Sequence, residues 1–201
     1  PGPIDDPEEV LAEVPTVGRY TVERGLVDSF FGNISYRVGD TIYISQTAAS
    51  LDELAGCVDP VPTDNRSTTG ITASSELLAH RRIYEATGAR AILHGHPKFA
   101  VAMSMLCDVI DCPVKDCWKD CTRVRMLGDT PIVAGEIGAG GLAVRVPPVI
   151  GGSGKAIVYG HGVFAVGKDG FEEAFRSMVD VENRCREEYF RRLDARVHSA
   201  S

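Results

Sequence analysis

Three histidines carry the most specific side-chain chemistry in this sequence. His94 and His96 flank Gly95, and His161 follows far downstream between two glycines. Because residues i and i+2 of a β-strand project from the same face, His94 and His96 can present two imidazoles to one point. A third histidine from a neighbouring strand would complete a set of three nitrogens, which leaves a position of a zinc ion open, as in catalytic zinc sites. The sequence therefore indicates an enzyme with a metal centre.

Glu76 and the two serines before it are predicted to lie at the start of a helix over residues 75–87, with Ser74 as its N-cap. The helix macrodipole favours an acidic residue there by about 0.3–1 kcal/mol, which is a sufficient structural reason for Glu76. Alternatively, Glu76 faces the metal, either as a fourth ligand or as the base that abstracts a proton. Ser74 and Ser75 have two explanations as well, because free N–H groups at a helix start need a cap and also bind anions such as phosphate.

Hydrophobic periodicity and turn residues indicate the elements that position these side chains. In the first part of the chain we expect a helix over 16–27, entered after Pro15 and ending at Gly25, and a hairpin of strands 32–38 and 41–45 around Gly39-Asp40. A mobile loop over 60–72, a candidate lid, is expected to precede the helix over 75–87, which ends at Gly88. The expected elements after it are a strand over 90–96 with Pro97 opening the next helix, strands and sharp turns over 131–166, and an amphipathic helix over 171–195. Interleaved strands and helices predict an α/β or mixed α+β class in which helices cover a sheet.

The composition argues against several classes of protein. With 201 residues, the chain is expected to form a single domain, 1–201, with 1–15 as an N-terminal extension. The net charge of −7 argues against a nucleic-acid partner, because such proteins need a basic face. No stretch reaches the roughly 18 apolar residues of a membrane span, and the acidic N-terminus does not resemble a signal peptide, so we expect a cytoplasmic protein without a membrane partner. Because the chain starts with Pro1 and not Met, we expect that preceding sequence was trimmed.

Four of the six cysteines crowd into one short segment. Cys107, Cys112, Cys117 and Cys121 are separated by four, four and three residues, which matches no standard iron–sulfur or zinc ligand run. The simpler interpretation is reduced thiols along a helix, since Cys117 and Cys121 are i, i+4 neighbours. A metal-thiol redox or sensing role is the alternative.

Five short motifs in a fixed order resemble the class II aldolase and adducin-like family, over about residues 16–193. They are Gly32-Asn33-Ile34-Ser35, Ser45-Gln46-Thr47-Ala48-Ala49-Ser50, Ser74-Ser75-Glu76, His94-Gly95-His96 and Gly160-His161-Gly162. The family includes fuculose-phosphate and rhamnulose-phosphate aldolases, ribulose-phosphate 4-epimerase, a methylthioribulose-phosphate dehydratase and some decarboxylases. Adducin is its non-catalytic member.

The resemblance implies a three-layer αβα fold with a central, mainly antiparallel sheet. It also implies a divalent metal on His94, His96 and His161, usually Zn²⁺ with Mn²⁺, Co²⁺ or Fe²⁺ as alternatives, and Glu76 as the acid/base that can also ligate. The residues implied to hold the phosphate of a small-molecule substrate are Gly32, Asn33, Thr47, Ala48, Ser74 and Ser75. A homotetramer with active sites at subunit boundaries is implied as well.

Three departures from the family pattern bear on the substrate and the mechanism. Ala48 stands where the family has glycine, and its methyl group would crowd a phosphate. No tyrosine lies between His96 and Ala156, where the aldolases have a proton donor; the candidates to replace it are Asp116, Asp120, Cys117 and Tyr189. Phe30 and Phe31 precede the first motif and favour a less sugar-like substrate.

The leading hypothesis is a metal-dependent aldolase that cleaves a carbon–carbon bond in a hydroxy-carbonyl compound, with Glu76 moving the proton. Epimerisation, dehydration and decarboxylation follow the same enolate chemistry and stay open. The rival is an adducin-like interaction module, against which the three histidines argue. His80 and His198 lack a comparable setting and are expected at the surface.

Overall fold

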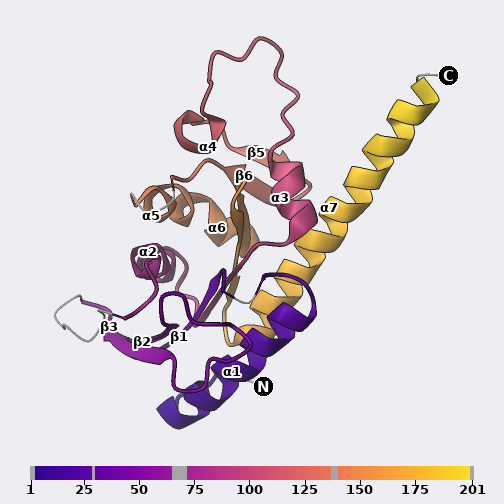
Figure 1. The fold of residues 1–201 in the computed structure, drawn as a ribbon. Helices are drawn as coiled ribbons and strands as arrows, with labels where there is room; N and C mark the ends of the chain where they lie inside the picture. Colours follow the sequence, from indigo (N-terminus) through magenta and orange to yellow (C-terminus); the bar gives the residue numbers. More distant parts are fainter. Residues whose placement is uncertain (1–2, 29, 65–71, 137–139, 200–201) are drawn as a thin grey trace.

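The computed structural model describes residues 3–28, 30–64, 72–136 and 140–199 (Figure 1). The described strands form one sheet in the order β3-β2-β1-β4-β8-β7-β6-β5. The strands are β1 (Asn33–Val38), β2 (Thr41–Ser45), β3 (Val58–Pro62), β4 (Ala91–Gly95), β5 (Arg125–Leu127), β6 (Thr130–Val133), β7 (Lys155–Val158) and β8 (Gly162–Gly167). Neighbouring strands are antiparallel except for β6 and β7, which are parallel.

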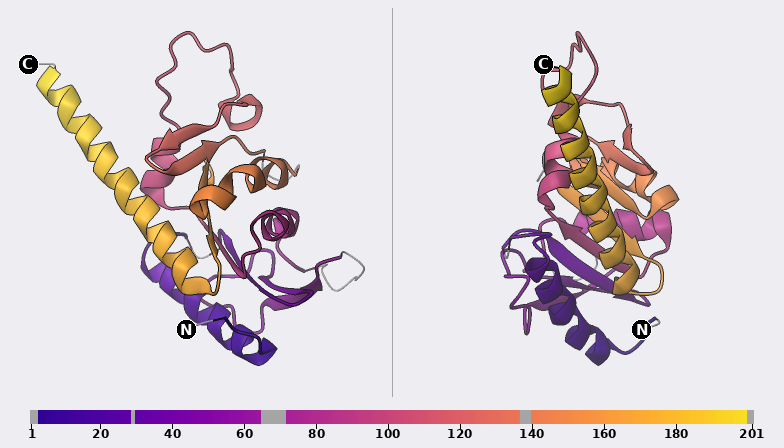
Figure 2. Two further views of the ribbon diagram at one scale, coloured as in Figure 1. Left: turned by 180° about the vertical axis from the view of Figure 1, so that it is seen from behind. Right: turned by 90° about the vertical axis from the view of Figure 1, so that its right-hand side faces the viewer.

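Helices cover both faces of this sheet, as Figure 2 shows. The helices are α1 (Pro7–Glu23), α2 (Leu77–Thr87), α3 (Lys98–Ser104), α4 (Cys117–Asp120), α5 (Gly141–Arg145), α6 (Pro147–Ser153) and α7 (Phe171–Ser199). One hydrophobic cluster joins α1, α3 and α7 to the sheet, and a second joins α2, α5 and α6 to it. The predicted three-layer αβα fold with a mainly antiparallel sheet is therefore confirmed. None of the helices in the described part of the chain has the length and apolar character needed to cross a bilayer.

The alternation of side chains along the strands places polar residues under α2. On β4, Leu93 belongs to the cluster under α7, whereas Ile92 belongs to the one under α2. His94 lies two residues after Ile92 and therefore on the α2 face of the sheet. On β1, Asn33 and Ser35 contact a side chain of α2 and share this face with His94. The site is built where these polar positions meet.

Several sequence predictions are confirmed at the level of whole elements. The hairpin turns at Gly39-Asp40, where Val38 pairs with Thr41. The strand before the histidine pair is β4, and α2 ends at Gly88, whose φ of +66° is a left-handed cap that glycine adopts without strain. The amphipathic C-terminal helix is α7.

The N-terminal prediction was wrong. The first helix begins at Pro7, nine residues before the predicted start, because Asp6 accepts the N–H of Glu8 and Pro7 suits the first helical position. Pro15 lies inside α1 instead of at its entrance. Residues 7–15 are therefore part of the first helix.

Three further boundaries differ from the prediction. The edge strand β3 lies partly within the predicted loop over 60–72, because an edge strand tolerates proline. The rest of that loop, and so the candidate lid, lies largely outside the described residues. The expected strands between residues 141 and 153 are the helices α5 and α6, since Pro147 opens a helix at its first position. Finally, α2 begins at Leu77 with Glu76 as its N-cap, so Ser74 is not the capping residue.

Candidate metal centre

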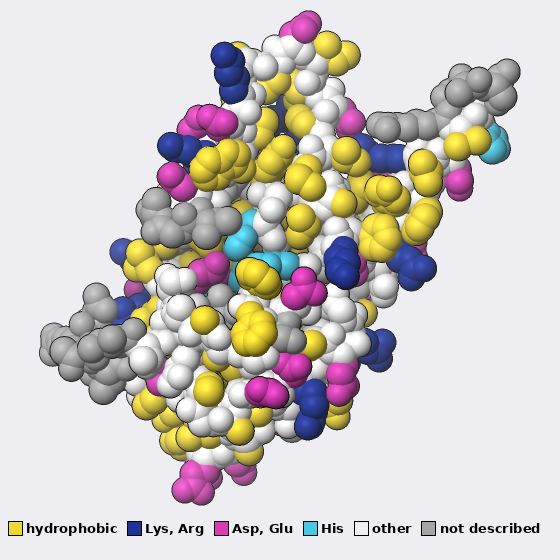
Figure 3. Space-filling model, viewed as in Figure 1, with side chains coloured by type: hydrophobic (Ala, Val, Ile, Leu, Met, Phe, Trp, Pro, Cys, Tyr) yellow, Lys and Arg dark blue, Asp and Glu magenta, His cyan; other side chains and the backbone are white. Residues whose placement is uncertain are grey.

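The three predicted histidines converge through their Nε2 atoms. The Nε2 of His94 lies 3.1 Å from that of His96 and 3.1 Å from that of His161. All three ligand atoms lie within 4.8 Å of one another, the arrangement required for a shared cation. Histidine side chains reach the surface near the middle of the face shown in Figure 3, so a small molecule can approach them.

The sheet brings these residues together from two distant segments. His94 on β4 pairs with Asn33 of β1 on one side and with Phe164 of β8 on the other. His96 follows the end of β4. His161 was predicted within a strand but lies in the tight turn between β7 and β8, because the strands pair up to that point. The antiparallel β4–β8 pairing thus carries this turn to the end of β4.

The surroundings of His94 hold its ring in the form that binds metals. Its Nδ1 lies 3.0 Å from the carbonyl oxygen of Val163 and donates its proton there, so the Nε2 lone pair is directed at the other two rings. Phe164 stacks on the same ring with centroids 4.1 Å apart. Burial holds the pKa of His94 well below its usual value and lowers that of His96 to about 4. Both rings are therefore neutral at physiological pH.

The geometry fits a divalent cation. Nitrogens bound 2.0–2.1 Å from a tetrahedral zinc ion are about 3.4 Å apart. The 3.1 Å separations of these nitrogens are close to that value. The Nε2 lone pair of His94 is buried and faces two other imidazole nitrogens. A cation bound between the three nitrogens would stabilise this arrangement. Three imidazole ligands would leave a coordination position for substrate, which favours a catalytic over a structural site.

Glu76 lies beside the three nitrogens. Its Oε1 is 3.3 Å from Nε2 of His161, and its Oε2 is 3.5 Å from Nε2 of His94. Burial alone would raise the pKa of Glu76, but the histidines and the hydrogen bond from Asn33 outweigh it and hold the pKa below the usual range. The side chain is therefore a carboxylate directed at the metal position, and its place at the helix start does not by itself explain that direction.

Two glycines are required for the approach of the ligand segments. A Cβ on Gly162 would lie 2.3 Å from the carbonyl oxygen of Gly95 and 2.6 Å from Cδ2 of His96. The missing side chain of Gly95 makes room on the opposite face of the sheet, where a Cβ would lie 2.9 Å from the Leu26 carbonyl and 3.0 Å from the sulfur of Met178.

The predicted phosphate-binding residues lie on neighbouring segments. Gly32 has a φ of +88° and packs so tightly that a Cβ there would lie 2.5 Å from the carbonyl oxygen of His94. The turn that contains Thr47 and Ala48 lies beside the segment leading into α2, because the Thr47 hydroxyl donates to the carbonyl of Ala73 at 2.8 Å. Ala48 has a φ of +60°, the left-handed conformation that favours glycine.

The remaining predicted phosphate ligands differ in exposure. Ser74 is buried, and its hydroxyl accepts the backbone N–H of Glu76 at 3.3 Å, whereas Ser75 is exposed. The side chain of Asn33 is directed at Glu76, to which it donates at 2.9 Å. Asn33 therefore contacts the proposed acid/base directly, a role that its motif did not indicate.

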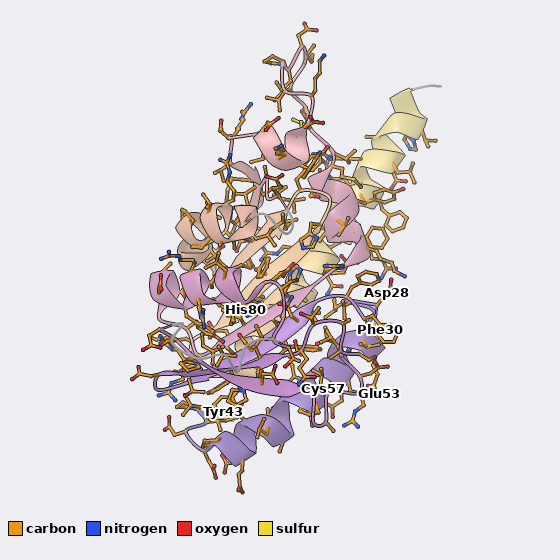
Figure 4. All side chains as sticks on the ribbon, turned by 60° about the vertical axis from the view of Figure 1, so that its left-hand side comes forward. Asp28, Phe30, Tyr43, Glu53, Cys57 and His80 are labelled. Atoms are coloured by element: carbon orange, nitrogen blue, oxygen red, sulfur yellow. The ribbon has the colours of Figure 1, made fainter. Side chains whose placement is uncertain are left out.

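His80 was predicted at the surface, and this was wrong. Its side chain is fully buried between α2 and the sheet, where Figure 4 labels it. It contacts Asn33 and Ser35, and Tyr84 follows one helical turn later. Sequence reasoning missed these residues, although the four-residue spacing of Glu76, His80 and Tyr84 on one helix face was a usable signal. His198 is exposed, as predicted.

The cysteine group does not form a comparable site. Cys107, Cys112, Cys117 and Cys121 line one cavity of about 120 Å³, and all of them are free thiols. Within the described part of the chain, no three of their sulfurs come as close together as the three histidine nitrogens. A second cavity of about 1060 Å³ lies between α7 and β5 and is lined by none of the site residues.

Of the predicted substitutes for the family tyrosine, Tyr189 lies on α7 with its ring against two other aromatic rings. Its ring contacts Phe99 at 5.4 Å and Phe190 at 5.5 Å between centroids. Cys117, Asp116 and Asp120 lie at or beside α4, on the long segment between α3 and β5 that extends from the sheet in Figure 1. The hydrogen bonds and ring contacts of the three histidines, as far as the structure describes them, involve none of these candidates.

Known proteins match this chain over most of its length. The family model of the class II aldolase and adducin N-terminal domain matches residues 12–189. The solved structure of an L-fuculose-1-phosphate aldolase from Thermus thermophilus superposes with a TM-score of 0.75 and 25% sequence identity, covering 92% of this chain and 94% of that chain.

Two curated proteins match a shorter part. A 3-oxo-tetronate 4-phosphate decarboxylase from Cupriavidus necator is 33% identical over 99 residues, which are 46% of this chain and 44% of that protein. A probable bifunctional methylthioribose-1-phosphate isomerase/methylthioribulose-1-phosphate dehydratase from Nocardia farcinica is 29% identical over 102 residues, 46% of this chain and 18% of that protein. The match thus spans less than half the length of either curated relative.

Proposed function

Because the chain belongs to the class II aldolase and adducin family, we propose that it is a metal-dependent lyase that breaks or forms a carbon–carbon bond in a small hydroxy-carbonyl compound. The convergence of three imidazole nitrogens beside the carboxylate of Glu76 carries this proposal. A non-catalytic, adducin-like module has no need for neutral histidines around an open coordination position.

His94, His96 and His161 would hold the divalent cation, with Zn²⁺ as the first choice for three nitrogens and Mn²⁺, Co²⁺ or Fe²⁺ as alternatives. Such a cation polarises a carbonyl or hydroxyl oxygen and stabilises the negative charge that develops when the bond breaks. The Val163 carbonyl and the Phe164 ring support the proposal because they fix the His94 ring before any ligand arrives.

Glu76 is proposed to move the proton. Its lowered pKa makes it a carboxylate at neutral pH, so it is in the form that accepts a proton from substrate and returns it later. Asn33 occupies one side of Oε2, which limits the directions from which a substrate proton can approach that oxygen. A carboxylate held in this way needs no reorientation before the transfer.

The substrate is proposed to be a sugar phosphate or a related hydroxy acid of carbohydrate metabolism. The relatives' names, an L-fuculose-1-phosphate aldolase among them, support a phosphorylated substrate. The turn at Thr47 and Ala48 and the serines before α2 are the proposed phosphate site. Phe30 and Phe31, 67% and 59% exposed, favour a substrate with an apolar part. We also propose one domain and a homotetramer with sites at subunit boundaries.

A second candidate is decarboxylation or dehydration at the same site. The absence of a tyrosine between His96 and Ala156 removes the proton donor that the aldolases of the family have. Both curated relatives carry out one of these other reactions by name, which supports this candidate further. Epimerisation stays open on the same grounds.

A substrate screen tests the proposed function. Purified protein is loaded with each divalent metal and assayed against sugar phosphates and hydroxy acids, with Glu76→Gln and His94→Ala as controls. We expect metal-dependent turnover that falls at least about 100-fold in Glu76→Gln, the usual contribution of an acid/base group. Full activity in Glu76→Gln, or a metal content unaffected by His94→Ala, would contradict the proposal.

A further inference from the structure

Side chains from α2 and β1 alternate in a buried row behind Glu76. Glu76, His80 and Tyr84 are spaced by four residues and therefore share one face of the helix. Asn33 and Ser35 are spaced by two residues and share one face of the strand. The two periodicities interlock, so that each strand residue lies between two helix residues.

Hydrogen bonds connect this row from end to end. The hydroxyl oxygens of Tyr84 and Ser35 are 2.7 Å apart, and the Ser35 oxygen lies 2.7 Å from Nδ1 of His80. Nε2 of His80 contacts Oδ1 of Asn33, and Nδ2 of Asn33 donates to Oε2 of Glu76 at 2.9 Å. The row thus leads from the protein interior to the carboxylate at the metal centre.

The chemistry of the groups fixes the direction of every donor. A carboxylate only accepts, so the amide nitrogen of Asn33 faces Glu76 and its oxygen faces His80. His80 must then donate from Nε2, which leaves Nδ1 of the neutral ring as an acceptor for the Ser35 hydroxyl. Because its own proton goes to His80, the Ser35 oxygen can only accept from the Tyr84 hydroxyl, which also lies 3.3 Å from the carbonyl oxygen of Arg90. From Ser35 onward, every donor is directed toward Glu76.

The row is isolated from solvent, which strengthens its hydrogen bonds. Ser35 and His80 are fully buried, Tyr84 is 2% exposed and Asn33 is 5% exposed. Burial lowers the pKa of His80 to about 4 and raises that of Tyr84, so both side chains are neutral at physiological pH. Hydrogen bonds in such surroundings polarise one another, and an unpaired polar group there is costly.

We propose that His80 is a positioning residue of the active site, which acts through Asn33 to fix the orientation of the Glu76 carboxylate. This inference rests on the proposed function and extends it. With Oε2 held by Asn33, Oε1 lies beside His161 and both oxygens face the metal position. Without His80, the Asn33 amide can rotate and turn its oxygen toward the carboxylate, which repels it.

Three variants separate positioning from a structural role. His80→Leu removes both ring nitrogens, and His80→Gln keeps a donor and an acceptor. Ile83→Val alters an equally buried side chain of α2 that belongs to the core cluster and not to the row. For each variant, kcat, KM and zinc content are measured.

We expect His80→Leu to lose about 10- to 100-fold in kcat, the usual cost of losing a supporting contact, with KM and zinc content close to wild type. His80→Gln should recover most of the lost kcat, and Ile83→Val should leave kcat, KM and zinc content unchanged. A His80→Leu variant that behaves like Ile83→Val would overturn the proposal.

A measurement without turnover keeps this test separate from the proposed function. Long-range ¹H–¹⁵N spectra of histidine-labelled protein report which ring nitrogen carries the proton. We expect His80 as the neutral Nε2–H form at neutral pH, and loss of that form in Asn33→Ala. A cationic or Nδ1–H ring refutes the row even if the enzyme is active. Absence of turnover in wild type with the expected ring form counts against the proposed function alone.

Discussion

Replacing Gly162 by alanine tests how closely the ligand segments must approach. Gly162 follows His161 and opens β8, beside the end of β4. An added Cβ would lie 2.3 Å from the carbonyl oxygen of Gly95, 2.6 Å from Cδ2 of His96 and 3.0 Å from Cε1 of His94. Two of these neighbours are rings of the candidate metal centre and the third is backbone, so none can move without displacing that centre.

The size of the effect follows from these distances. Carbon and oxygen atoms in favourable contact are about 3.3–3.6 Å apart, so the two strands must separate by roughly 1 Å. Overpacking of this kind costs about 1–3 kcal/mol of folding free energy. Because a functional site tolerates only about 0.5 Å of displacement, we expect zinc affinity to fall by about 10- to 100-fold.

Gly160→Ala is the matched control on the other side of His161. Gly160 has a φ of +63°, so alanine there costs about 1–2 kcal/mol, but its Cβ would meet only Met105 at 3.7 Å. Both variants should therefore lose similar stability in urea unfolding, while only Gly162→Ala loses zinc affinity in competition with a chelator. Wild-type zinc affinity in Gly162→Ala, or equal losses of affinity in both variants, would refute the reasoning.

Three other changes have defined outcomes. Ala48→Gly should raise the free energy of unfolding by up to about 1 kcal/mol in urea titrations, because glycine adopts the left-handed conformation at φ +60° without the strain that alanine has there. A loss of stability would contradict this. The Glu182 carboxylate of α7 accepts the N–H groups of Phe99 and Ala100 at the start of α3, which has no side-chain cap of its own. Glu182→Ala should therefore lower the free energy of unfolding by about 1–2 kcal/mol, and Glu182→Gln by less. Equal losses in both variants would exclude a contribution from the charge. Between pH 6.5 and about 4 the unfolded chain binds a proton at His80 that the folded chain does not. The free energy of unfolding should therefore fall with the pH over this range, by up to about 3 kcal/mol. Urea titrations of His80→Gln should show a smaller loss over this range, and a loss identical to that of the wild type would contradict this contribution of His80.

Local patterns predicted most of the fold and the histidine pair of the candidate metal centre. The alternation in residues 32–45 and the turn at Gly39 and Asp40 are short-range signals, and the hairpin follows from them. The histidine pair on β4 lies on one strand face for the same reason. The pairing of β4 with β8 is long-range, so local patterns alone could not establish the approach of His161 to the pair.

The errors have physical causes as well. A proline inside a helix and two prolines in an edge strand are tolerated in this fold, although both are usually signs of a boundary. His80 was missed because a buried polar side chain is identified by its partners, and Asn33 and Ser35 lie more than forty residues away in the chain. Its spacing from Glu76 was visible, but a helix face rich in polar residues ordinarily faces solvent.

X-ray absorption at the zinc edge tests the metal centre most directly, because nitrogen and sulfur ligands scatter at different distances. For protein loaded with one equivalent of zinc, we expect three imidazole nitrogens at about 2.0–2.1 Å, light-atom scatterers in the remaining positions and no sulfur. The His94→Ala variant should lose this spectrum. Sulfur scatterers at about 2.3 Å would assign the ion to the cysteine group instead and contradict a catalytic centre on His94, His96 and His161.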